Sequence, residues 1–129
     1  GGCDGAAPPV GLLHSKESGT VLQSTYGYKM KEGACKRGTN AKIAQVYKLN
    51  SVCQALPGND IGFEDVLDKY GPFLVAIAAV GKFNSYSGGV YTDAESCGLD
   101  VNHAVVVVGY GRDNSTGLKY WLIKVTLFY

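Results

Sequence analysis

Residues 101–111 read VNHAVVVVGYG, an almost continuous apolar run with one histidine near its start. A second run, FLVAIAA, occupies residues 73–79 and follows a Gly-Pro pair. Short apolar runs bounded by turn-forming residues are typical of strands that are buried on both faces. We therefore predict strands at Phe73–Ala79 and Ala104–Tyr110, and we expect the two to be neighbours in one sheet.

A third strand is predicted after the histidine run. Residues 112–118, RDNSTGL, contain the Asp, Asn, Ser and Gly residues that favour turns. Residues 119–126, KYWLIKVT, have the length and composition of the next antiparallel strand. Such strands need a covering layer, so a chain that holds only part of a larger fold would leave apolar faces and strand edges open.

The first seventy residues predict less regular structure. Gly11–Glu17 can form a short helix that is entered through Pro8-Pro9 and stopped by Gly19. Thr39–Val52 has the β-branched character of a strand and leads into a turn at residues 57–60, PGND. Phe63–Tyr70 has apolar residues at helical spacing and ends at Gly71-Pro72, which predicts an amphipathic helix.

Composition limits the function classes. The chain has 129 residues, 46% of them apolar, the length and content of one ordinary globular domain. Twelve Lys and Arg against eleven Asp and Glu leave a net charge of +1 without a long like-charge block, so we expect no nucleic-acid partner. The longest apolar stretch, 73–80, is far below the roughly 18 residues of a membrane span, so we expect no membrane association.

The four cysteines are Cys3, Cys35, Cys53 and Cys97. In an oxidising compartment they could form two disulfides in any of three connectivities. No C-x-x-C pair or similar zinc spacing occurs, so we predict neither a metal site nor a cofactor.

Several motifs together resemble the papain-like, cathepsin-like cysteine proteases. They are the histidine run, YWLIK at 120–124, FNSYSGGVY at 83–91, GPFLVAI at 71–77 and GCDGA at 2–6. The resemblance extends from Gly1 to Lys124. It implies an incomplete papain-like α+β fold, mainly the antiparallel β lobe with one or two short helices. Residues 1–35 would form the segment at the lobe boundary, and residues 36–129 the β-rich lobe.

The resemblance also assigns roles to individual residues. His103 would be the catalytic histidine, which keeps the attacking cysteine as a thiolate and then protonates the leaving amine. Gly5 and Ala6 would lie along an extended peptide substrate, although Ala6 replaces a glycine of the family pattern. The substrate cleft would be lined by Ala76, Asn102 and Ala104, and the small side chains at 76 and 104 would leave room for a bulky apolar group.

Two parts of the family's catalytic machinery are missing from the sequence. The family places an asparagine after the lysine that corresponds to Lys124, where this chain has Val125, and none of the four cysteines has the C-G-[SA]-C-[WY] context of the nucleophile. By resemblance, the disulfide partners of Cys3, Cys35 and Cys97 would also lie outside this chain. We therefore expect the chain alone to be inactive.

Two functions remain open. The chain could be a portion of a lysosomal or secreted cysteine endopeptidase that acts on peptide or protein substrates, is bound by cystatin-like inhibitors and is completed by the N-terminal half of the same protease domain. It could instead be a catalytically inert homologue with a binding or regulatory role. Residues 114–116, Asn-Ser-Thr, form a candidate N-glycosylation site at Asn114 within a predicted turn, which suits a secretory protein.

Overall fold

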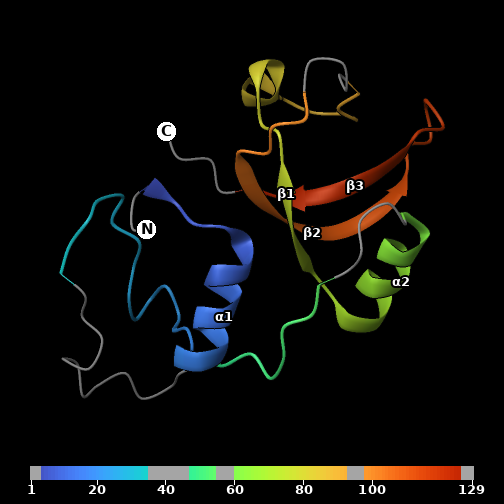
Figure 1. The fold of residues 1–129 in the computed structure, drawn as a ribbon. Coiled ribbons are helices and arrows are strands. Elements are labelled where there is room, and N and C mark those ends of the chain that lie inside the picture. The colour runs from blue at the N-terminus through green and yellow to red at the C-terminus, as the bar shows by residue number, and fades with distance from the viewer. Residues whose placement is uncertain (1–3, 35–46, 55–59, 93–97, 126–129) are drawn as a thin grey trace. The chain divides into compact units, whose positions relative to one another are not determined.

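The structure, a computed structural model, describes residues 4–34, 47–54, 60–92 and 98–125 (Figure 1). Apart from the last two residues, the chain divides into two compact units, Gly1–Gln54 and Ala55–Leu127. The lobe boundary predicted near residue 35 falls beside a segment outside the described residues, and it stays a prediction. No helix in the described part of the chain is long and apolar enough to cross a membrane.

The described part of the first unit contains the α-helix α1 (Pro8–Ser18). Pro8 and Pro9 occupy its first positions, where their missing N–H groups cost nothing. The helix ends at Gly19, which has a φ of 77° and donates its N–H to the Ser15 carbonyl over 3.0 Å. The predicted helix and its glycine stop are confirmed, with the helix extended at both ends. None of its side chains is buried.

The described part of the predicted strand at 39–52, residues 47–52, does not form a strand. Residues 39–46 lie outside the described residues. In the described remainder only Tyr47 is paired, through an isolated antiparallel bridge with Thr20 whose two N–H···O distances are 2.7 and 2.8 Å. The alternation in the sequence is real, but a strand requires a partner along its whole length.

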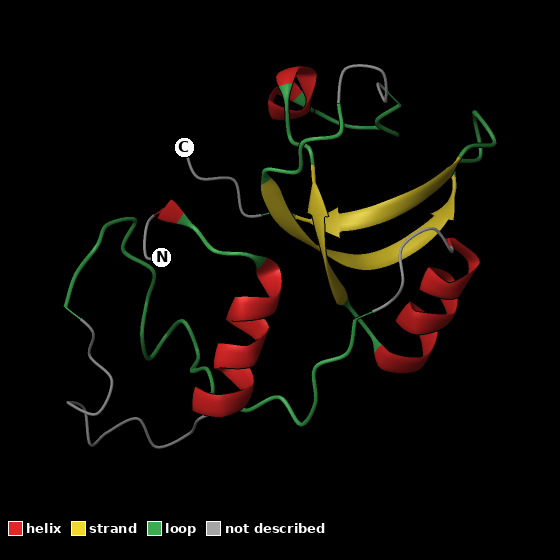
Figure 2. Cartoon of the chain, viewed as in Figure 1, coloured by secondary structure: helices red, strands yellow, loops and turns green. Residues whose placement is uncertain are grey.

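The second unit is built on a three-stranded antiparallel sheet in the order β1-β2-β3 (Figure 2). The strands are β1 (Phe73–Ile77), β2 (His103–Arg112) and β3 (Lys119–Lys124). Phe73 pairs with Val107 and Ile77 with His103, while Lys124 pairs with Val106 and Lys119 with Arg112. The three predicted strands, their adjacency and the turn at 112–118 are therefore confirmed.

A bulge between Val107 and Gly109 shifts the register of β2 against β3. Beyond it, Gly109 and Gly111 face Leu122 and Tyr120. A Cβ at position 111 would lie 2.7 Å from the Tyr120 hydroxyl, and one at position 109 would lie 3.4 Å from the Leu122 Cβ. Both glycines thus allow β3 side chains to lie directly over the backbone of β2.

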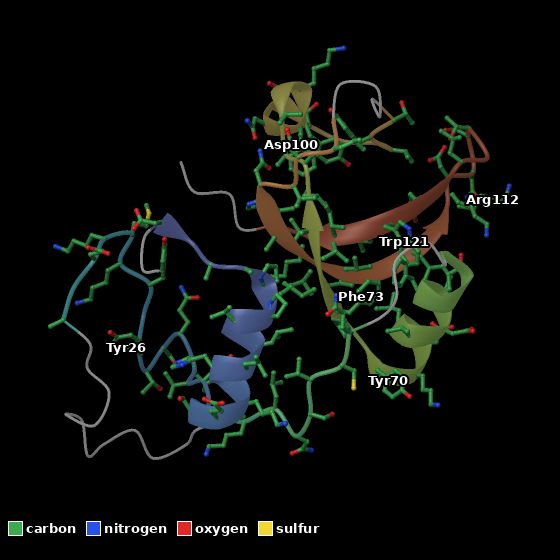
Figure 3. The ribbon with its side chains drawn as sticks, viewed as in Figure 1. Tyr26, Tyr70, Phe73, Asp100, Arg112 and Trp121 are labelled. Carbon is green, nitrogen blue, oxygen red and sulfur yellow. The ribbon has the colours of Figure 1, made fainter. Side chains whose placement is uncertain are left out.

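One face of the sheet packs against α2 (Asp60–Tyr70) (Figure 1). The Phe63 ring lies 5.6 Å from the Phe73 ring. Trp121 contacts Phe73 and Tyr110 edge to face; Figure 3 labels Trp121 and Phe73. Val105 and Val107, which point to this face, are the buried hydrophobic core of the described chain, with 2% and 4% exposure. The helix ends as predicted, where Gly71 at a φ of 84° donates to the Leu67 carbonyl.

Candidate functional site

His103 is the first residue of β2 and lies opposite Ile77 of β1. Because side chains alternate along a strand, His103 shares the α2 side of the sheet with Val105 and Val107. Its side chain is half-buried, and Nε2 is shielded from solvent without a hydrogen-bond partner in the described part of the chain. A shielded imidazole nitrogen without a partner costs free energy, so this atom is suited to a polar group that the described residues do not supply.

Asn102 fixes the residue immediately before His103. Its Oδ1 accepts the Ala79 N–H over 2.8 Å, and its Nδ2 donates to the Ala79 carbonyl over 3.3 Å. Its own N–H donates to the Ile77 carbonyl over 3.0 Å. Three hydrogen bonds therefore tie the residue before β2 to Ile77, the last residue of β1, and to Ala79 just beyond it, and they hold the backbone that carries His103.

Ala76 and Ala104 are direct cross-strand partners, and both are exposed. They lie on the sheet face opposite His103, where two methyl groups leave an open area beside the first residues of β2. Four of the predicted site residues, Ala76, Asn102, His103 and Ala104, thus lie at the adjoining ends of β1 and β2, with the side chains of Ala76 and Ala104 on the other sheet face from His103. Both polar atoms of the Asn102 side chain already make hydrogen bonds to Ala79. The predicted role of Asn102 in substrate binding therefore stays a prediction that is based on its position beside His103.

Gly5 and Ala6 belong to the first unit. Both are exposed. Gly5 has a φ of 82°, a conformation that residues with side chains rarely adopt, so this glycine is required by the backbone. Neighbouring Cys3 lies outside the described residues, and the predicted role of Gly5 and Ala6 in substrate binding stays a prediction.

Val125 follows the last residue of β3. Lys124 pairs with Val106, so the chain at 125 runs beside the part of β2 that leads back to His103. Val125 is half-buried and carries no hydrogen-bonding side-chain group. It therefore cannot satisfy the shielded Nε2 of His103.

The FNSYSGGVY segment forms a small aromatic cluster after β1. The first three residues of this segment, 83–85, belong to a 3-10 helix, η2 (Gly81–Ser85), which was not predicted from the sequence. Tyr91 contacts the rings of Phe83 and Tyr86 at 5.8 and 6.4 Å, and the Tyr86 hydroxyl donates to the Gly89 carbonyl over 2.5 Å. The Tyr91 hydroxyl is shielded and has no partner among the described residues.

Metal-ligating groups do not gather in the described chain. Within residues 4–34, 47–54, 60–92 and 98–125, no three His, Cys, Asp or Glu side chains are placed to hold an ion. Cys53 is a free, exposed thiol. The other three cysteines lie outside the described residues, so their predicted pairings stay predictions.

Comparison with known proteins agrees with this arrangement. The model of the papain family cysteine proteases matches residues 1–126. The chain belongs to the papain family. It is 36% identical to the thiol protease aleurain of Arabidopsis thaliana over 127 residues, and 33% identical to a cysteine proteinase of Theileria annulata over 123 residues.

A solved structure matches the fold as well as the sequence. Digestive procathepsin L 3 from the larval midgut of Tenebrio molitor superimposes with a TM-score of 0.74 at 31% identity over 95% of this chain. The predicted fold class is therefore confirmed, as a partial papain-like fold. The chain covers 38% of that structure, 34% of aleurain and 26% of the Theileria protein. It thus spans about a third of the length of its relatives in the papain family.

Proposed function

We propose that this chain supplies the histidine-bearing part of a cysteine endopeptidase active site, and that the nucleophilic cysteine and the group that orients the histidine come from outside it. The observation that carries the proposal is the shielded, unpartnered Nε2 of His103 within the described chain. The fixed backbone at Asn102 supports it, because a general base must be held in one geometry to act on a neighbouring thiol.

In this mechanism His103 takes the proton of the incoming cysteine thiol and later gives it to the leaving amine of the substrate. The exposed pair Ala76 and Ala104 lies next to His103 along the strands but on the opposite sheet face; it would accept a substrate side chain there, and its small methyl groups favour a bulky apolar one. The partner is the N-terminal part of a papain-type domain, the substrates are peptides or proteins, and cystatin-like proteins are the expected inhibitors. The relatives are cathepsin-like and digestive enzymes, which supports a lysosomal or secreted location.

The first test is mass spectrometry of the native protein from its source under non-reducing conditions. The expected result is that peptides containing His103 travel with a larger species that includes a C-G-[SA]-C-[WY] segment. A peptide-based electrophile should label the cysteine of that segment, and His103→Ala should abolish labelling while His14→Ala, an exposed position on α1, leaves it unchanged.

A different outcome would select the second function. A species of this chain's own mass, with free or internally paired cysteines and no labelling, would overturn the endopeptidase proposal. It would leave the catalytically inert homologue, which binds a protease, an inhibitor or a peptide.

A further inference from the structure

The turn between β2 and β3 is organised around one carboxylate. Asp113 Oδ1 accepts the Ser115 N–H and hydroxyl over 3.2 and 2.6 Å, and the Thr116 N–H and hydroxyl both over 2.7 Å. These hydrogen bonds lower the pKa of Asp113 from 3.8 to about 2. The Ser115 hydroxyl contributes most to the shift, followed by Thr116. At neutral pH the carboxylate is charged and can accept all four of these hydrogen bonds.

The same turn contains the acceptor sequence Asn114-Ser115-Thr116. An N-linked glycosylation acceptor needs a hydroxyl two residues after the asparagine. Here that hydroxyl belongs to Thr116, which donates to Asp113 and also accepts the Leu118 N–H over 3.4 Å. The hydroxyl that defines the acceptor is thus used on both its donor and its acceptor side when the hairpin is formed.

Asn114 itself is left out of this network. Its side chain is exposed and makes no hydrogen bond in the described part of the chain. A glycan on its amide would therefore displace no hydrogen bond of the turn. Asn114 lies just beyond the opposite end of β2 from His103, roughly 30 Å away at the usual rise per strand residue, so the glycan would be remote from the candidate site.

We propose that Asn114 carries an N-linked glycan that is added before the β2–β3 hairpin closes, because the folded turn, although exposed, holds the Thr116 hydroxyl in hydrogen bonds to Asp113 and Leu118. In the transfer, Asn114 Nδ2 forms a bond to the anomeric carbon of a lipid pyrophosphate-linked oligosaccharide. The bond from that carbon to the phosphate oxygen breaks, the lipid pyrophosphate leaves with the electron pair, and Nδ2 loses one proton. This proposal rests on the secretory location given under the proposed function, and it does not require the proteolytic activity.

The site is tested by expressing the chain behind a cleavable export signal in eukaryotic cells and analysing the peptide that contains Asn114 by mass spectrometry. Supplying the signal separates failure of the site from failure of the proposed location. The expected result is a glycan that N-glycosidase removes, lost in Thr116→Ala and kept in Ser115→Ala. These two variants are matched, since each deletes one hydroxyl bond to Asp113. An unmodified Asn114 in the exported chain would overturn the proposal.

The order of events is tested on unglycosylated chain made in bacteria, incubated with purified oligosaccharyltransferase and its lipid-linked donor. Asp113→Ala should accept the glycan several-fold faster than the unaltered chain, and urea should remove the difference. Asp113→Asn is avoided because it would create a second acceptor sequence. Equal rates in buffer, or fast hydrogen exchange of the Ser115 and Thr116 amides in the unaltered chain, would show that the turn does not hold the Thr116 hydroxyl away from the transferase.

Discussion

The two compact units differ in what holds them. In the second, three hydrogen-bonded strands, α2 and a set of ring contacts surround Val105 and Val107. In the described residues of the first, 4–34 and 47–54, α1 buries none of its side chains, and the backbone links beyond the helix and its local turns are the bridge between Thr20 and Tyr47. In this chain, therefore, local signals suffice to form a helix, whereas burial depends on strands brought together from distant parts of the sequence.

The largest effect is expected from Val105→Ala. Deleting two methyl groups from a side chain that is 2% exposed should lower the free energy of unfolding by about 2 kcal/mol, from lost burial and the cavity left behind. Urea denaturation measures it. The matched control is Val108→Ala on the same strand, 38% exposed, which should change stability by less than about 0.5 kcal/mol. Equal effects would mean that the sheet has no defined core.

Asn102→Ala should have the next largest effect, because it removes both hydrogen bonds to Ala79. We expect a loss of about 1 kcal/mol in unfolding free energy and faster hydrogen exchange of the Ala79 amide. Asn102→Asp keeps the acceptor for that amide and loses only the donor, so the Ala79 amide should stay protected. If exchange at Ala79 is unchanged in Asn102→Ala, the link between the strand ends is not formed in solution.

Tyr91→Phe should stabilise the second unit. The hydroxyl of Tyr91 is shielded and has no partner among the described residues, while its ring contacts Phe83 and Tyr86. Removing the hydroxyl keeps the ring and relieves the desolvation cost, for a gain of up to about 1 kcal/mol. Tyr86→Phe is the control, because the Tyr86 hydroxyl donates to Gly89 and its loss should not stabilise. Destabilisation by Tyr91→Phe would reveal a partner for that hydroxyl.

The β2–β3 turn should respond to acid. The pKa of Asp113 is about 2 in the folded chain and 3.8 as the ordinary value. The charged carboxylate therefore stabilises the folded turn at every pH above the pKa of the unfolded chain. That contribution should be retained from pH 7 to about pH 4 and lost between about pH 4 and pH 2. Chemical shifts of the Ser115 and Thr116 amides measure the titration, and Asp113→Ala should abolish it. A midpoint near the ordinary aspartate value would mean that the turn does not hold the carboxylate.

The smallest effect is expected in the first unit. Val10 in α1 is 57% exposed, so Val10→Ala should change the free energy of unfolding by less than about 0.5 kcal/mol. Its matched partner is Val105→Ala, the same chemical change in the second unit. A loss as large as that of Val105→Ala would show that α1 is covered in solution, and the contrast between the units would disappear.

The elements that the sequence predicted correctly are those that are indicated by neighbouring residues alone. Both helices end at a glycine with positive φ that the sequence marked, Gly19 and Gly71. The strands of the second unit are predicted by apolar runs, and their bounds differ from the predicted ones by at most two residues. The strand predicted at 39–52 shows the opposite case: alternation alone cannot supply a partner, and in residues 47–52 only Tyr47 has one. The candidate site was located by motif resemblance, because a lone histidine on an apolar strand is not by itself diagnostic.

The sequence by itself determined the family motifs, the strand and helix propensities and the presence of His103, since these depend on residue types and their spacing. Only the tertiary structure decided that Asn102 is held by the Ala79 peptide group, that Ala76 lies opposite Ala104, and that the Thr116 hydroxyl is taken up by Asp113. The physical reason is that each of these contacts depends on strand register or turn closure. A shift of one residue in register would turn every side chain of a strand to the other face, and composition does not encode that choice.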